Sequence, residues 1–133
     1  MDRSELRTYC LTKRGAWEDF PFGEGVAVYK VMDKMFALMP VGGPVQISLK
    51  CDPFWAKLLR DTYPAVTPAY HLNKQHWNGV SLDGSIRDDE IREMVDHSYD
   101  LVVKGLTKAQ RLALERAQPD HLNTGNRQQG GGQ

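Results

Sequence analysis

The chain has 133 residues, of which 41% are hydrophobic and 26% are charged, a balance that excludes disordered and fibrous classes of protein. A chain of this length can bury roughly two-thirds of its unfolded surface as one domain, whereas two domains would each be too small to hold a core. Seventeen Lys and Arg residues balance seventeen Asp and Glu residues, so the molecule lacks the strong positive field of a protein that binds nucleic acid tightly.

The charges are nevertheless unevenly distributed along the chain. Residues 26–82 contain six Lys and Arg against three Asp, whereas residues 83–105 contain three against seven Asp and Glu. Two interpretations stay open at this stage, solvated charge scattered over a surface and a basic region with a binding role.

No window approaches the roughly 18 apolar residues of a membrane span, and the first residues contain no apolar signal region. We therefore expect a cytoplasmic protein without membrane contact and, in the absence of any oligomerisation signal, a monomer. Cys10 and Cys51 are expected to be free, because paired cysteines are uncommon in that compartment.

The first predicted element is a helix that begins near Ser4, a favourable N-cap residue, and ends before Gly15. Residues 17–25 combine aromatic and acidic residues with Pro21 and glycines, which predicts a packed loop. Strands are predicted at 26–31, 35–39 and 45–49, with a short turn at 32–34 that makes the first two a hairpin.

Asp52 and Pro53 predict the start of a second helix, with Trp55, Leu58 and Leu59 as its buried stripe. A second hairpin is predicted over 69–82, with its tip at 72–75.

A third helix follows a predicted capping box formed by Ser85 and Asp88. One apolar stripe supports this helix, and it consists of Ile91, Met94, Val95, Ser98, Leu101, Val102 and Gly105. Thr107 predicts a short final helix, and Pro119 should end it.

These elements predict an α+β fold in the order α-β-β-β-α-β-β-α. The expected architecture is a two-layer sandwich, an antiparallel sheet of about five strands with helices packed on one face. Residues 1–117 are predicted to form the single domain, and residues 118–133 a flexible tail, because that segment is rich in Gly and Gln and has little to bury.

The common catalytic and cofactor motifs are absent, including the Walker loop, the zinc helix, the CxxC pair and the nucleophile elbow. The sequence therefore predicts no catalytic residues, no enzyme, no cofactor and no metal. Glu18, Asp19 and Glu24 could form an acidic metal patch, but three loop carboxylates are more often solvated. A metal site of His71, His76 and Cys51 has too few ligands in a recognisable pattern, and His97 is expected to make a hydrogen bond at the edge of the core.

The most unusual stretch is Tyr70-His71-Leu72-Asn73-Lys74-Gln75-His76-Trp77. Its imidazole, amide, ammonium and aromatic groups suit contact with phosphates and bases or stacking on a flat ligand. The alternative is a hairpin in which Tyr70 and Trp77 anchor the core while Asn73 organises the turn.

Six blocks of sequence occur in an order that resembles the MmcQ/YjbR family. They are Tyr9-Cys10-Leu11 with Gly15-Ala16, Pro21-Phe22-Gly23, Lys34-Met35-Phe36-Ala37, Leu49-Lys50-Cys51-Asp52-Pro53, Tyr70 to Lys74 with His76-Trp77, and His97 to Val102. The resemblance covers roughly residues 4–108. Arg14 departs from it, because family members commonly carry proline before Gly15-Ala16, and this leaves the local turn in question.

The resemblance implies a CyaY-like fold and a double-wing mode of binding to double-stranded DNA, in which two β-hairpins straddle a duplex. The wings would be the hairpin around Lys30 to Lys34 and the hairpin around His71 to His76. The implied nucleic-acid-binding residues are Lys30, Lys34, Lys50, His71, Asn73, Lys74, His76 and Trp77. About three phosphate contacts would give weak, salt-dependent binding.

Two other functions remain open beside weak DNA binding. One is a non-enzymatic adaptor for a protein or small ligand, which would use Trp77, Tyr70 and the Lys and His residues near them. The other is an enzyme or metal carrier, which would have to depend on His71, His76, His97 and Cys51.

Overall fold

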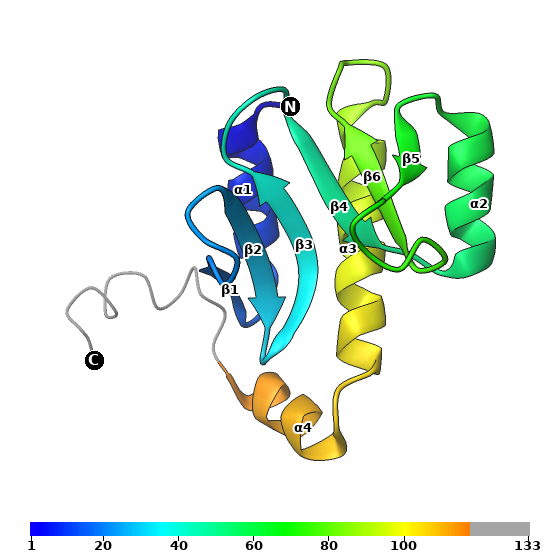
Figure 1. Ribbon diagram of the computed structural model, residues 1–133. Coiled ribbons are helices and arrows are strands. Elements are labelled where there is room, and N and C mark those ends of the chain that lie inside the picture. The colour runs from blue at the N-terminus through cyan, green and yellow to red at the C-terminus, as the bar shows by residue number, and fades with distance from the viewer. Residues whose placement is uncertain (118–133) are drawn as a thin grey trace.

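The computed structural model describes residues 1–117 and shows an antiparallel six-stranded sheet in the order β1-β2-β3-β4-β6-β5. Figure 1 shows helices α1 and α3 behind this sheet and α2 beside β5 and β6. The elements are α1 (Arg3–Leu11), β1 (Ala16–Asp19), β2 (Val26–Val31), β3 (Lys34–Pro40), β4 (Gln46–Lys50), α2 (Pro53–Thr62), β5 (Val66–Pro68), β6 (Trp77–Ser81), α3 (Asp88–Lys104) and α4 (Lys108–Arg116). The predicted α+β sandwich is confirmed. No helix in residues 1–117 is long and apolar enough to cross a membrane.

The sheet has one strand more than predicted, because the segment expected to be a loop begins with strand β1. Ala16 pairs with Val31 and Asp19 with Val28, which places β1 at the edge of the sheet beside β2. Only Ala16 of this strand is buried, so β1 lacks the alternating apolar pattern by which a strand is recognised in a sequence.

The second hairpin also differs from the prediction. Its first strand is β5, which ends at Pro68 and so precedes the predicted start at Ala69. Pro68 pairs with Asn78, and residues 69–76 form a long connection instead of a tight turn. Pro68 is compatible with this strand because β5 lies at the sheet edge, where a missing N–H donor costs little, and Pro64 precedes the strand.

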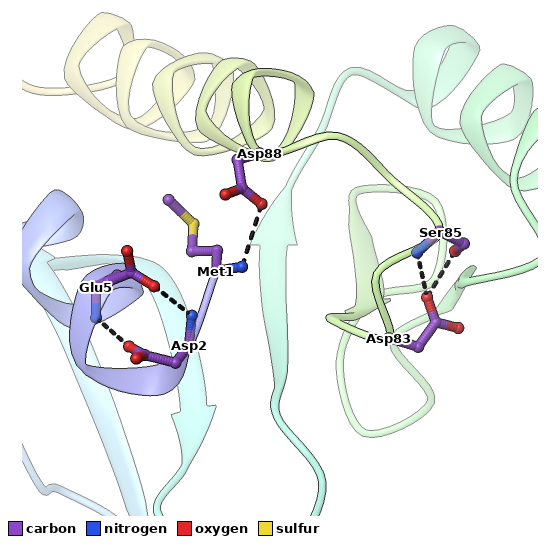
Figure 2. A network of polar contacts seen from close by, with 6 residues as sticks. All are labelled: Met1, Asp2, Glu5, Asp83, Ser85 and Asp88. Carbon is purple, nitrogen blue, oxygen red and sulfur yellow. Dashed lines mark hydrogen bonds and ion pairs between the residues drawn. The ribbon is translucent and has the colours of Figure 1, made fainter.

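Two predicted helix caps differ from the observed ones. Asp2, not Ser4, is the N-cap of α1: its carboxylate accepts the Glu5 N–H at 2.8 Å, and the Glu5 carboxylate accepts the Asp2 N–H at 2.9 Å (Figure 2). Ser85 does not cap α3, because its hydroxyl donates to Asp83 at 2.6 Å. Helix α3 has no side-chain cap, and its first-turn carboxylates face the positive end of the helix dipole instead.

Figure 2 also shows the start of the chain beside the start of α3. The Met1 amino group donates to Asp88 Oδ1 at 3.2 Å, and the Met1 side chain packs against the core. This contact brings the first turns of α1 and α3 together behind the sheet.

Helix α3 forms most of the helical side of the core. Residues Ile91, Met94, Val95, Ser98 and Val102 of its predicted stripe are buried. Ser98 also joins two strands, since its hydroxyl donates to the Phe36 carbonyl at 2.5 Å and accepts the Lys50 N–H at 2.8 Å.

Helix α2 packs differently from its predicted stripe. Asp52 is its N-cap, as predicted, but Ala56 is its buried residue. Leu58 is exposed and Trp55 is half-buried. Leu59 is half-buried and packs against the core, as predicted. The hydrophobic spacing therefore located the buried side of this helix, but it missed Ala56 and wrongly included Leu58.

Candidate nucleic-acid interface

The two connections proposed as wings lie at the same end of the sheet. The two-residue turn Met32-Asp33 joins β2 to β3, and the connection 69–76 joins β5 to β6. Lys50, the last residue of β4, pairs with Trp77, the first residue of β6, and so reaches this same end. The strand register therefore gathers the predicted turns and Lys50 along one rim.

Lys34 and Lys50 lie together in one shallow hollow at this rim. Its volume is about 230 Å³, and its other lining residues are Met35, Leu101, Val102 and Gly105. Gly105 is the C-cap of α3, so the hollow also lies near the negative end of that helix dipole. Within residues 1–117 neither lysine makes an ion pair.

Lys30, by contrast, is held by its neighbours. Its ammonium lies 2.9 Å from Asp19 Oδ2 and 5.1 Å from the centre of the Trp17 ring. The hydrogen bond from Lys30 lowers the pKa of the Asp19 carboxyl. Because a carboxylate already balances its charge, Lys30 adds little positive potential to the rim.

The connection 69–76 is organised by its own polar groups. Asn73 Oδ1 accepts the Gln75 N–H at 2.9 Å, as expected of a residue that organises a turn. The Lys74 carbonyl accepts a hydrogen bond from Arg60 of α2 at 2.9 Å. The Lys74 ammonium lies 5.2 Å from the centre of the Tyr70 ring and makes no ion pair within the described residues.

Trp77 and His76 are less available than the sequence suggested. Trp77 is only 9% exposed, so it packs inside the protein, whereas Tyr70 is 66% exposed and does not anchor the core. His76 is half-buried, and its carbonyl accepts the Cys51 N–H at 2.7 Å. His71 is exposed and faces a separate hollow on the open face of the sheet. Of the eight residues that the family resemblance implies for nucleic-acid binding, Lys34, Lys50 and Lys74 thus keep ammonium groups without an ion pair at the rim.

Two of the residues considered for catalysis or metal binding, His97 and Cys51, are held in structural surroundings. His97 Nε2 accepts the Asp52 N–H at 3.1 Å, which is the hydrogen bond predicted at the edge of the core. The His97 ring also packs edge-on against the Trp55 ring, with 4.4 Å between the two ring centres. Burial raises the pKa of the Cys51 thiol to about 11, so at neutral pH it is a protonated, weak nucleophile.

Two residues of the acidic patch, Glu18 and Asp19, make structural ion pairs. Glu18 pairs with Arg7 at 2.8 Å and Asp19 with Lys30. The hydrogen bond from Arg7 lowers the pKa of the Glu18 carboxyl. Across residues 1–117, no three His, Cys, Asp or Glu side chains are grouped so that they could hold a metal ion.

A larger hollow on the open face of the sheet was not predicted. Its lining comes from strands β2 to β6 and from two connections. Each contributing segment alone resembles ordinary strand or loop sequence, so no local pattern could reveal it.

These features define a small α+β domain with one sheet face covered by helices and the other open. The model of the family described as YjbR matches residues 11–101. The protein YjbR of Escherichia coli, described as uncharacterised, is 40% identical over 115 residues, which cover 86% of this chain and 98% of that protein. Another uncharacterised Escherichia coli protein, YbdF, is 38% identical over 90 residues, which cover 67% of this chain and 74% of its own. The chain belongs to the YjbR family.

Solved structures agree with this assignment. A crystal structure of a Deinococcus radiodurans protein, described with the family domain DUF419, is 39% identical and has a TM-score of 0.78, covering 84% of this chain and 86% of that one. A crystal structure of a Pseudomonas syringae protein is 30% identical, with a TM-score of 0.65, covering 76% of this chain and 98% of that one.

Proposed function

We propose that this protein is a binding protein rather than an enzyme, and that it binds double-stranded DNA weakly through its turn-bearing rim. The observation that carries the proposal is the placement of Lys34, Lys50 and Lys74 at one end of the sheet without ion-pair partners among the described residues. Unpaired ammonium groups bind phosphate oxygens by charge alone, so they require no particular base sequence.

The spacing of the two turns suits a groove of B-DNA. The β2–β3 and β5–β6 pairs are separated by β4 in the strand order. Their centres are therefore three interstrand spacings apart, roughly 14 Å at about 4.8 Å each. The major groove is about 12 Å wide, so the two connections can reach the phosphates on its two sides. This arrangement spans one groove and does not enclose a whole duplex.

The binding should be weak and sensitive to salt. The chain has no net charge at neutral pH, and three lysines neutralise only three phosphates. The slope of log K against log salt concentration should then be about −2.7, at roughly −0.9 per phosphate.

The test is a titration of a fluorescently labelled duplex at several salt concentrations with the wild type and with Lys34→Glu and Lys74→Glu. Each charge reversal should weaken binding to every duplex sequence and reduce the salt slope by about one. Arg87→Glu is the matched control, because Arg87 is exposed and lies at the opposite end of α3, roughly 25 Å from the Lys34 hollow. Absence of binding at low salt, or equal loss in all three variants, would reject the proposal.

A further inference from the structure

The open face of the sheet contains a hollow with a volume of about 570 Å³. In Figure 1 this face is turned toward the viewer, with α1 and α3 behind it. Val26, Leu38, Gln46, Ser48, Thr67 and Gly79 belong to the strands that form its floor. Hollows of this volume commonly hold small molecules.

Gly79 lies in the floor without a structural need for glycine. It is the middle residue of β6, paired with Ser48 on one side and Thr67 on the other. Its φ angle is not in the left-handed region, and an added Cβ would come no closer than 3.5 Å to Thr67 Oγ1, an ordinary contact. Glycine within a strand lowers stability and often marks a place where a ligand approaches the backbone.

Two exposed aromatic residues border this floor. Phe22 comes from the connection between β1 and β2, and Tyr70 comes from the connection between β5 and β6. Because β2 and β5 lie on opposite sides of the central strands, the two rings approach from opposite sides. They are 63% and 66% exposed, so both rings keep surface that is free to stack on a flat ligand.

The polar groups of the hollow determine what charge it accepts. The side chains of Ser48, Thr67 and His71 have no hydrogen-bond partner within the described residues, and no carboxylate lines the hollow. The ammonium of Lys74 does not line the hollow but lies 5.2 Å from the centre of the Tyr70 ring, which does. A ligand in the hollow can therefore receive hydrogen bonds and approach one ammonium group, and no carboxylate among the lining residues would repel an anionic ligand.

We propose that this hollow binds a small planar aromatic molecule that carries a carboxylate. The aromatic plane stacks against Phe22 and Tyr70 over Gly79, and the carboxylate faces the hydroxyl and imidazole donors and the Lys74 ammonium. This hollow shares no lining residue with the hollow of Lys34 and Lys50 and does not depend on DNA binding, although the Lys74 ammonium takes part in both proposals.

The test follows backbone amide signals of the full chain by nuclear magnetic resonance while naphthoate is added, with naphthamide as its neutral counterpart. Saturable shifts should concentrate at Ser48, Thr67 and Gly79. Naphthoate should bind about two- to fivefold more tightly than naphthamide, the range that one partly exposed ion pair supplies. Shifts centred elsewhere would overturn the site, and equal affinities would overturn the preference for an anion.

Three variants complete the experiment. Gly79→Leu fills the floor and should abolish the shifts while the spectrum stays that of a folded protein. Tyr70→Ala should weaken binding at least threefold by removing one stacking surface, about 0.6 kcal/mol. Phe54→Ala, which removes an exposed aromatic ring from α2 outside the hollow, should change nothing. If Gly79→Leu fails to fold, the comparison of Tyr70→Ala with Phe54→Ala decides.

Lys34→Glu separates this inference from the proposed function. It should weaken duplex binding and leave naphthoate binding unchanged, because Lys34 does not line the hollow. A loss of naphthoate binding in this variant would overturn the separation of the two sites.

Discussion

Trp77 and Tyr70 border the same connection but have opposite surroundings. Trp77 is buried at the start of β6, whereas Tyr70 is largely exposed. Trp77→Ala should therefore lower the free energy of unfolding by about 3–5 kcal/mol, the usual loss for a large buried aromatic side chain. Tyr70→Ala should change it by less than about 0.5 kcal/mol. Urea denaturation of both variants measures the difference, and similar losses would show that Trp77 is not a core residue.

His97 makes stability depend on pH because its half-buried imidazole accepts a hydrogen bond from the Asp52 N–H. Burial lowers the pKa of its imidazole, and the nearby carboxylates of Asp52 and Asp100 only partly oppose this. Between the lowered folded pKa and the unfolded value of about 6.5, the unfolded chain binds a proton that the folded protein does not bind. Stability should therefore rise with pH through this window and fall as the pH drops below about 6.5.

His97→Gln tests this dependence because glutamine keeps an oxygen that can accept the Asp52 N–H but does not titrate. The variant should be less stable near pH 7, since it loses the ring contact with Trp55. Its disadvantage should shrink as the pH falls below about 6.5, because proton binding by the unfolded chain then destabilises the wild type but not the variant. Urea denaturation across this range gives both curves, and parallel curves would contradict the assignment.

At the scale of elements, Arg60 of α2 fixes the connection between β5 and β6. Its guanidinium donates to the Lys74 carbonyl and to Asn78 Oδ1, each at 2.9 Å. Asn78 is buried, so Arg60→Ala should leave its oxygen without a partner and cost about 1–3 kcal/mol of stability. Amide hydrogen exchange should accelerate in residues 69–76. Lys57→Ala is the control, because Lys57 lies on the same helix and makes only an exposed ion pair with Asp61. It should neither lower stability nor accelerate exchange in residues 69–76, and equal effects of the two variants would reject this role for Arg60.

The elements also show what the sequence could predict. The stripe of α3 and the alternation of β4 were predictable because burial there repeats with the period of the helix or strand. Strand β1 was not predictable, because it depends on pairing with β2. The cap at Asp2 was readable but missed, since Asp2 and Glu5 have the spacing of a capping box. The family motifs located the connection 69–76, but only packing shows that Trp77 is buried and that Asp19 holds Lys30.

For the molecule as a whole, helix α4 extends the folded unit beyond the residues that the family model matches. Arg14 helps to hold α4 against the rest of the domain, because its guanidinium donates to the carbonyls of Glu115 and Ala117 at 3.0 and 3.1 Å. The residue that departs from the family pattern thus holds the end of α4 in place. Gln110 makes a further contact with Asp33 of the β2–β3 turn, so α4 supports the rim proposed to bind DNA.

Leu114 is the residue through which α4 joins the core, since it is 5% exposed and packs beside Gly15. Gly15 has a φ of 72°, and an added Cβ there would lie 2.5 Å from Leu114 Cδ1, so the turn after α1 and helix α4 fit closely. Leu114→Ala should cost about 2–5 kcal/mol of stability. Leu112→Ala is the matched control on the same helix, because Leu112 is 41% exposed, and it should cost less than about 0.5 kcal/mol. Thermal denaturation of both variants measures this difference. A lower midpoint in Leu114→Ala alone makes α4 part of one cooperative unit. Equal midpoints in the two variants would mean that the domain ends before α4.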